Sequence, residues 1–302
     1  MKVVIAGGSG LIGRELTRRL VADGIEVAIL SRHPERVSGL PPMAVAVRWD
    51  GVSAGALAPR LEGASAVVNL AGENIAAGRW SAARKRRIWT SRVRTASAMA
   101  TALERVDRRP AVFLQASAVG IYGPRGDSTV TESDPPGRDF LAQVCRDWEA
   151  ASAGVENFGV REVVVRTGVV LTDRGGALPR IAVPFKLFVG GRLGSGKQWL
   201  PWIHIKDEVR AIRFLLERQD ASGPFNLTAP NPVTNSDMAA TIGRTLGRPS
   251  LIPTPAQALR IAMGEMATLV LDGQRAIPRR LVKHGFQFRF EQFEPAVRDL
   301  LT

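Results

Sequence analysis

The segment Lys2–Gly13, KVVIAGGSGLIG, decides the fold. Its apolar run Lys2–Ala6 predicts a strand, which passes directly into glycines at positions 7, 10 and 13 and then into a helical stretch. The first glycine permits a tight turn, the second lets backbone approach a pyrophosphate, and the third lets the helix pack against the strand. The phosphates would lie at the positive end of the helix that begins near Leu11. The motif therefore predicts a dinucleotide-binding unit rather than a plain loop.

Short apolar runs alternate with helical stretches through the first two-thirds of the chain. The runs are rich in Val, Ile and Ala without clean alternation, as expected for parallel strands covered on both faces. Strand–helix–strand repetition predicts an α/β fold with a doubly wound parallel sheet. The expected strands are Lys2–Ala6, Glu26–Leu30, Ala44–Arg48, Ala66–Leu70, Ala111–Gln115 and Arg161–Arg166, and the expected helices are Ile12–Asp23, Ser81–Arg105 and Asp139–Ser152.

The composition of the sequence changes near Thr172, and the segment Gly175–Pro201 that follows is rich in glycine and proline. We predict a Rossmann-type domain over residues 1–171 and a smaller C-terminal substrate lobe over residues 172–302. Late strands should return to the first domain from about residues 203–228, with one near Pro224–Leu227. The tail, residues 250–302, should be mostly helical, with one extended stretch at Gly285–Phe290.

The composition is that of a globular protein: 45% of the 302 residues are hydrophobic and 23% are charged. No apolar run has the roughly 18 residues that a membrane span needs, and the N-terminal run lacks the length and cleavage site of a signal peptide. The single cysteine, Cys145, forms no internal disulfide and suits a reducing compartment. The three histidines show no metal-binding spacing. We expect a cytoplasmic protein with no membrane contact and no metal.

The formal net charge of +13 raises the question of nucleic-acid binding. The arginines are spread along the chain, with one dense cluster at 84–87, and no stacking aromatics are interleaved with them. This pattern favours a solvated helix face beside an anionic cofactor. We expect a small-molecule partner rather than nucleic acid, and the sequence does not indicate the oligomeric state.

The end of the second strand predicts which dinucleotide binds. Enzymes that prefer NAD usually carry Asp or Glu here, on the ribose 2′-hydroxyl, whereas this chain has Ser31 and Arg32. A hydroxyl and a guanidinium match a phosphate monoester. The sequence therefore predicts NADP(H) rather than NAD, the alternative being an ordinary surface arginine after a strand.

Together these motifs resemble those of the extended short-chain dehydrogenase/reductases, the nucleotide-sugar epimerase and dehydratase superfamily. The resemblance rests on the glycine spacing and on the segments Asn69–Gly72, Ser117–Gly123 and Arg166–Val170. The chain is also similar to one branch, the atypical "epimerase family" proteins with a C-terminal domain of unknown function. That similarity rests on Gly72–Ile75, Arg79–Trp80, Ser91–Val93, Gly194–Gln198, Pro201–His204 and Gly264–Glu265.

The resemblance implies a set of cofactor contacts that runs from the adenosine end to the nicotinamide end. The 2′-phosphate would contact Ser31 and Arg32, and the nicotinamide end would contact Val169. The remaining implied contacts are Gly7, Ser9, Gly10, Leu11, Ile12 and Gly13 of the glycine loop, Leu70 and Ala71 beneath the ribose and pyrophosphate, and Arg87 and Arg92 of the following helix.

Members of this superfamily that move hydride usually exchange protons through a Tyr-x-x-x-Lys pair on one helix face. The matching helix here is Asp139–Ser152, with Leu141 and Cys145 at those two positions. The chain has one tyrosine, Tyr122, in a Tyr-Gly turn, so no such pair exists anywhere in it.

Three other residues are candidates for the missing chemistry. Ser117 would orient a substrate oxygen, or simply bond backbone at the strand end. Glu73, or water, would serve as acid and base, unless Glu73 is a structural loop acid. Tyr122 would be a weak acid with a pKa near ~10 in the absence of lysine, and packing is its alternative role.

The segment Gly191–Lys197 matches the phosphate loop of nucleotide triphosphatases, G-x-x-x-x-G-K. That loop needs Ser or Thr next, to bind magnesium, and this chain has Gln198. We therefore expect a substrate loop, with Lys197, Gln198 and Trp202 lining a pocket between the lobes.

These observations predict an NADP(H)-binding oxidoreductase or epimerase-like protein acting on a small molecule of the sugar-nucleotide or carbonyl type. The alternative is a non-catalytic NADP(H)-binding redox sensor or regulatory protein. The missing Tyr-x-x-x-Lys pair favours this alternative, and the pocket-like segment Gly191–Trp202 disfavours it.

Overall fold

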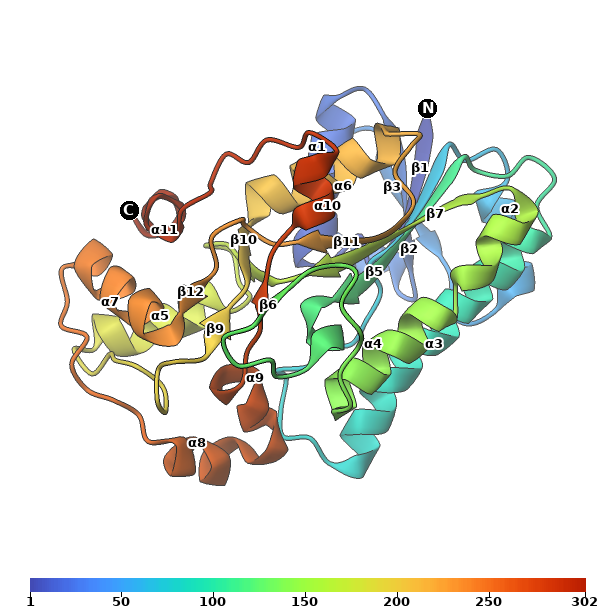
Figure 1. Ribbon diagram of the computed structural model, residues 1–302. Coiled ribbons are helices and arrows are strands. Elements are labelled where there is room, and N and C mark those ends of the chain that lie inside the picture. Colours follow the sequence, from blue (N-terminus) through green and yellow to red (C-terminus); the bar gives the residue numbers. More distant parts are fainter.

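The computed structural model describes residues 1–302, and its centre is a seven-stranded sheet in the order β11-β7-β5-β4-β1-β2-β3 (Figure 1). All six pairings are parallel. The chain builds outward from β1 to one side and then, from β4, to the other. This is the doubly wound arrangement that the sequence predicts. The strands are β1 (Lys2–Ala6), β2 (Glu26–Ser31), β3 (Ala44–Arg48), β4 (Ala66–Asn69), β5 (Val112–Ala118), β7 (Arg161–Thr167) and β11 (Gly223–Leu227).

Helices cover both faces of this sheet, which explains the apolar runs without alternation. Val3 and Ile5 of β1 belong to one core, with residues of α1 (Leu11–Ala22) and α6 (Ile205–Glu217). The intervening Val4 belongs to a second core, with residues of α2 and α3. The helices of this second layer are α2 (Ala54–Leu61), α3 (Ala82–Glu104) and α4 (Phe140–Ala150), and Figure 1 shows α3 and α4 side by side.

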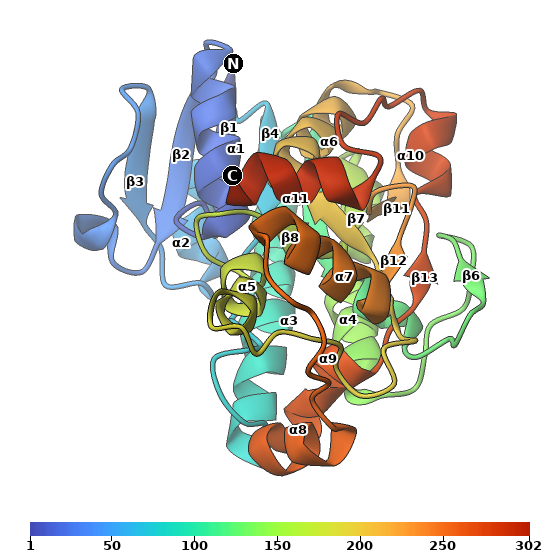
Figure 2. The ribbon, with the colours of Figure 1, turned by 90° about the vertical axis from the view of Figure 1, so that its left-hand side faces the viewer.

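A smaller core lies beside the sheet, around the buried side chains of Trp202 and Phe293. Three short strand pairs lie outside the main sheet: β8 with β10, β9 with β12, and β6 with β13. Figure 2 shows α7 and α11 close together, with α5 beside them. These elements are β6 (Thr129–Val130), β8 (Val169–Leu171), β9 (Trp199–Leu200), β10 (Trp202–His204), β12 (Val233–Thr234), β13 (Arg275–Ala276), α5 (Leu178–Lys186), α7 (Asn235–Leu246), α8 (Ala256–Met263), α9 (Thr268–Leu271), α10 (Arg279–Lys283) and α11 (Phe293–Leu301).

The structure departs from the sequence expectations in two places. The sequence pattern did not indicate α2, which has only eight residues and contains Pro59. Strand β5 extends to Ala118, three residues past the expected end at Gln115. The stretch Gly285–Phe290, expected to be extended, is not helical and pairs with no strand, and the Asp207 carboxylate accepts hydrogen bonds from the backbone N–H groups of its last two residues, Arg289 and Phe290.

The domain division at residue 172 remains a prediction, with two structural facts bearing on it. Strand β11 lies in the main sheet, next to β7, as expected for a late returning strand. Leu281 and Phe286, from the C-terminal tail, are buried in the same core as β1 and α1. No helix combines the length and the apolarity needed to cross a membrane.

Candidate functional site

The glycine loop between β1 and α1 has the close backbone contacts expected of a phosphate cradle. Gly7 has φ +77°, and a Cβ on it would lie 2.6 Å from the carbonyl carbon of Leu70. A Cβ on Gly13 would lie 2.4 Å from the carbonyl oxygen of Gly7, so only glycine lets α1 approach the loop. Gly10 caps α1 without a side-chain hydrogen bond. The N–H groups of the first helical turn therefore face outward, where an anion can bind them.

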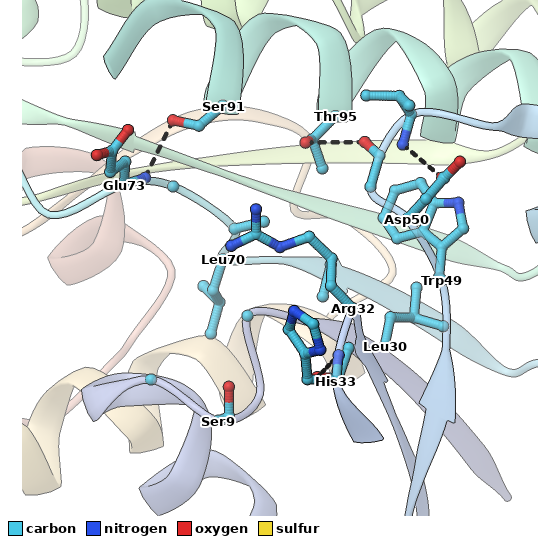
Figure 3. A pocket seen from close by; sticks show the side chains of 18 of the residues that line it. Ser9, Leu30, Arg32, His33, Trp49, Asp50, Leu70, Glu73, Ser91 and Thr95 are labelled. Carbon is cyan, nitrogen blue, oxygen red and sulfur yellow. Dashed lines mark hydrogen bonds between the residues drawn. The ribbon is translucent and has the colours of Figure 1, made fainter. Parts of the chain in front are cut away.

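This loop forms one wall of a cavity of about 720 Å³ at the carboxyl ends of β1, β2, β3 and β4. Figure 3 shows Arg32 and His33, after β2, on one side of the space, with Glu73 and Ser91 on another. Arg32 is exposed, and its guanidinium has no ion-pair partner in the protein. The predicted cofactor residues that line this first cavity are Gly7, Ser9, Gly10, Ser31, Arg32, Leu70, Ala71 and Arg87.

The far end of the first cavity contains residues that the sequence analysis missed. Trp49 and Asp50 follow β3, and Asp50 accepts hydrogen bonds from the N–H groups of Val52 and Ser53, at 2.9 and 2.8 Å. Thr95 of α3 donates to the carbonyl oxygen of Gly51, at 3.0 Å (Figure 3). Ligands of such sheets bind at the carboxyl ends of the strands, so the position of these residues after β3 was the available signal.

Glu73 lines this first cavity and is held by cations. Its carboxylate pairs with Arg84 and, at 3.4 Å, with Arg87. Its backbone N–H donates to Ser91 Oγ at 3.0 Å, and its carbonyl oxygen accepts from Arg92 at 3.1 Å. The structure does not bring Glu73 together with Ser117, because Ser117 lines a different cavity.

The second cavity, of about 470 Å³, adjoins the first, because Leu70 lines both. Three predicted cofactor residues line it, namely Ile12, Arg92 and Val169, which was predicted for the nicotinamide end, and so does Ser117. Two predicted cofactor residues line neither cavity: Gly13 packs within the loop, and Leu11 lies beside Gly176. Leu141 and Cys145 of α4, at the usual Tyr and Lys positions, are also in the wall of the second cavity.

Ser117 belongs to a polar row that the sheet register creates. Parallel pairing puts Ser117 of β5 opposite Arg166 of β7, and Arg166 opposite Asn226 of β11. Ser117 Oγ donates to Glu149 Oε1 of α4 at 2.6 Å. Arg166 donates hydrogen bonds to both carboxylate oxygens of Glu149, at 3.0 and 2.9 Å. Burial lowers the pKa of Arg166, but the hydrogen bonds and charge of Glu149 outweigh this and raise it, so Arg166 remains protonated.

Tyr122 extends this polar row and is not among the residues that line the second cavity. Its hydroxyl donates to Asn226 Oδ1 at 2.7 Å and accepts from Arg166 at 3.1 Å. The side chain is fully buried and lines neither cavity, and burial raises its pKa to about 12. Burial likewise raises the pKa of Cys145 to about 12, so this thiol stays protonated at neutral pH.

The three predicted substrate residues lie outside the second cavity. Lys197 is exposed, and Gln198 Nε2 donates to the carbonyl oxygens of Leu193 and Val270, at 3.0 and 2.7 Å. Trp202 is fully buried and its Nε1 donates to the carbonyl oxygen of Asn231 at 2.9 Å. The intervening β9 turns Trp199 and Leu200 toward the cavity instead.

The C-terminal segment supplies one further wall that the sequence analysis did not anticipate. Leu269 of α9 packs against the small apolar cluster formed by Trp80, Ile88 of α3 and Val144 of α4. Lys85 of α3 pairs with Glu265 at 2.6 Å, which ties this segment to the first domain.

Comparison with known proteins agrees with this architecture. Residues 3–228 match the NAD dependent epimerase/dehydratase family, and residues 254–300 match a domain of unknown function. An epimerase family protein of Mycobacterium tuberculosis is 43% identical over 95% of this chain and 93% of its own length. Epimerase family protein YfhF of Bacillus subtilis is 38% identical over 100% of this chain and 98% of its own. These matches confirm the resemblance that the motifs indicate.

Solved structures extend the comparison. The crystal structure of human epimerase family protein SDR39U1 with NADPH is 34% identical, with a TM-score of 0.89 over 99% of both chains. The Thermus thermophilus UDP-glucose 4-epimerase in complex with NAD is 18% identical, with a TM-score of 0.78 over 99% of this chain and 97% of its own. The second likeness concerns the fold alone.

Proposed function

Because the chain belongs to the NAD dependent epimerase/dehydratase family, we propose that it is an NADP(H)-dependent oxidoreductase whose substrate binds in the second cavity, beside Ser117. Arg32 supports the choice of NADP(H), since its unpaired guanidinium faces the first cavity. The human relative, 34% identical, was crystallised with NADPH. When bound, this cofactor supplies a hydride donor or acceptor at its nicotinamide.

The observation that carries the proposal is the 2.6 Å hydrogen bond from Ser117 Oγ to Glu149. Because the serine hydrogen is committed to a carboxylate, the oxygen presents lone pairs to the cavity. Ser117 therefore binds a substrate hydroxyl, which can donate, better than a carbonyl, which cannot.

The same contact provides a proton path in place of Tyr-x-x-x-Lys. The hydroxyl proton of the substrate passes to Ser117 Oγ while the serine proton passes to Glu149 Oε1, so the serine ends neutral. Arg166 holds Glu149 in position for this transfer. In the reverse direction the proton returns to the substrate oxygen. We therefore assign proton transfer to Ser117 assisted by Glu149, and not to Glu73, which is paired with two arginines in the other cavity.

The proposal is tested by titrating the purified protein with NADPH and NADH, and by following NADP⁺ reduction with a panel of alcohols. We expect tighter binding of NADPH than of NADH, together with a rate of NADP⁺ reduction that Ser117→Ala lowers strongly without changing NADPH affinity. Tighter NADH binding would contradict the cofactor assignment. NADPH binding without turnover of any alcohol or carbonyl compound would favour the non-catalytic alternative.

A further inference from the structure

The second cavity differs from a nucleotide-sugar site in the charge of its walls. Arg92 is the one cationic side chain among its lining residues, against three carboxylates, those of Asp139, Glu265 and Asp272. A nucleotide sugar carries about two negative charges on its diphosphate, and proteins bind such groups with cations or with unpaired backbone N–H groups. The second cavity therefore has the wrong charge for that class of ligand.

Arg92 is not available to bind a phosphate group, because its guanidinium already contacts other groups of the protein. Its Nη1 donates to the carbonyl oxygens of Glu73 and Ile88, both at 3.1 Å. Its carbon Cζ lies 5.0 Å from the ring centroid of Trp148, in a cation–π contact.

Two of the carboxylates have no cation paired with them. Glu265 is neutralised by Lys85, whereas Asp139 only accepts the N–H of Ala142 at the start of α4, at 2.8 Å. Burial raises the pKa of Asp272 and the charge of Asp139 adds to this, although the nearby Arg260 counteracts part of the shift without pairing directly with the carboxylate.

The rest of the cavity wall is mainly apolar and includes the rings of Trp80, Phe140, Trp148 and Trp199. Trp80 and Phe140 pack edge to face, with ring centroids 5.3 Å apart, and Trp199 approaches from β9. Leu141 of α4 and Leu269 of α9 extend this surface. Aromatic and aliphatic walls of this kind bind flat apolar groups, which gain by leaving water.

Building on the proposed function, we propose that the substrate is an uncharged alcohol with a flat, largely apolar ring body, and not a nucleotide sugar. The ring packs against the aromatic wall, and the hydroxyl binds Ser117 Oγ. The carboxylates of the second cavity exclude phosphates.

The test measures equilibrium binding to the NADPH-saturated protein, with 1-tetralol and UDP-glucose as probes. We expect 1-tetralol to bind at least ~10-fold more tightly than UDP-glucose. Tighter binding of UDP-glucose, or binding of neither probe, overturns the proposal. Because binding is measured without turnover, 1-tetralol that binds but is not oxidised would leave the substrate class standing while the proposed function fails.

Two variants locate the probe. Trp199→Ala should weaken 1-tetralol binding about fivefold, with Trp199→Phe as the matched control that keeps an aromatic ring. Leu141→Lys adds a cation from α4 and should weaken 1-tetralol binding while strengthening that of UDP-glucose. NADPH affinity should be unchanged in all three proteins, which also reports that they fold. Unchanged 1-tetralol affinity in both Trp199→Ala and Leu141→Lys would overturn the proposal.

Discussion

The two adjoining cavities present groups of opposite charge to a ligand, although Leu70 lines both. The first presents a glycine backbone and the guanidinium of Arg32, and its carboxylates Asp50 and Glu73 are engaged with neighbouring protein groups. The second presents aromatic rings and carboxylates, and its one cation is bonded to backbone carbonyls. Net charge is thus a poor guide to a binding site, because a chain of +13 holds both environments side by side.

The largest effect should come from breaking the polar row at the second cavity. Ser117→Ala should lower the rate of NADP⁺ reduction by roughly 10²–10⁴-fold, since proton transfer in the transition state is lost. Steady-state kinetics would measure the rate, and NADPH affinity should not change. Equal loss of NADPH affinity would contradict a role confined to the second cavity.

Glu149 acts on the substrate only through Ser117. Its variants must therefore distinguish a role in proton transfer from a purely structural role. Glu149→Gln should lower the rate about as much as Ser117→Ala and should alter the pH–rate profile, because a carboxamide cannot take up the serine proton. Glu149→Asp, which keeps the charge opposite Arg166, should recover part of the rate. An unaltered pH–rate profile in Glu149→Gln would reduce Glu149 to a structural partner of Arg166.

The next largest effect concerns charge in the first cavity. Arg32→Asp should weaken NADPH binding by roughly 100-fold and leave NADH binding equal or stronger, because a charged hydrogen bond is replaced by repulsion. Fluorescence titration would measure both affinities. Arg36→Asp is the matched control, since Arg36 makes the same change of charge nearby but lies outside the cavity lining. Equal losses of NADPH affinity in the two variants would mean that Arg32 acts only through long-range electrostatics and not through direct contact with the 2′-phosphate.

A smaller effect concerns how the free energy of unfolding depends on pH. It arises at the buried Glu208, whose carboxyl group accepts a hydrogen bond at 2.9 Å from Thr167, a residue that lines the second cavity. Burial raises the pKa of Glu208 from 4.5 to about 8. The folded protein therefore holds this proton while the unfolded chain has released it. The protonated Glu208 carboxyl contributes fully to the free energy of unfolding below about pH 4.5. This contribution is lost as the pH rises toward about 8, by at most about 1.4 kcal/mol per pH unit.

Glu208→Gln should remove this slope and make the variant relatively more stable above about pH 8. Urea unfolding at several pH values between the two limits would show it. Glu217→Gln, on the exposed end of the same helix, is the control and should keep the wild-type slope. A wild-type slope in Glu208→Gln would mean that this carboxyl is ionised in the folded protein.

The smallest effect is expected at Glu73. Glu73→Gln should change the rate by less than about fivefold, the range of a partly exposed ion pair. NADPH affinity should rise slightly, because Arg87 loses its carboxylate partner at the edge of the first cavity. A loss of rate as large as that of Ser117→Ala would return the acid–base role to Glu73.

Local sequence patterns predicted the first cavity well and the second poorly. Gly7 and Gly10 lie in the loop after β1, and Ser31 and Arg32 lie at the end of β2, so strand position alone brought them to one edge of the sheet. Lys197, Gln198 and Trp202 were assigned to a pocket from a glycine-rich loop, and none of them lines the second cavity. A loop can turn its side chains either way, and here the pairing of β9 with β12 decides which residues face inward.

The sequence by itself determined the doubly wound sheet, the dinucleotide cradle, the Ser31–Arg32 pair and the absence of Tyr-x-x-x-Lys. Each of these depends on residues that are neighbours in the chain, or on counting one residue type. The tertiary structure alone decided that Ser117 meets Glu149 and Arg166, that Tyr122 is buried behind them, and that α9 closes the second cavity. Those contacts join distant segments, and they depend on strand register and helix packing, which no local pattern specifies.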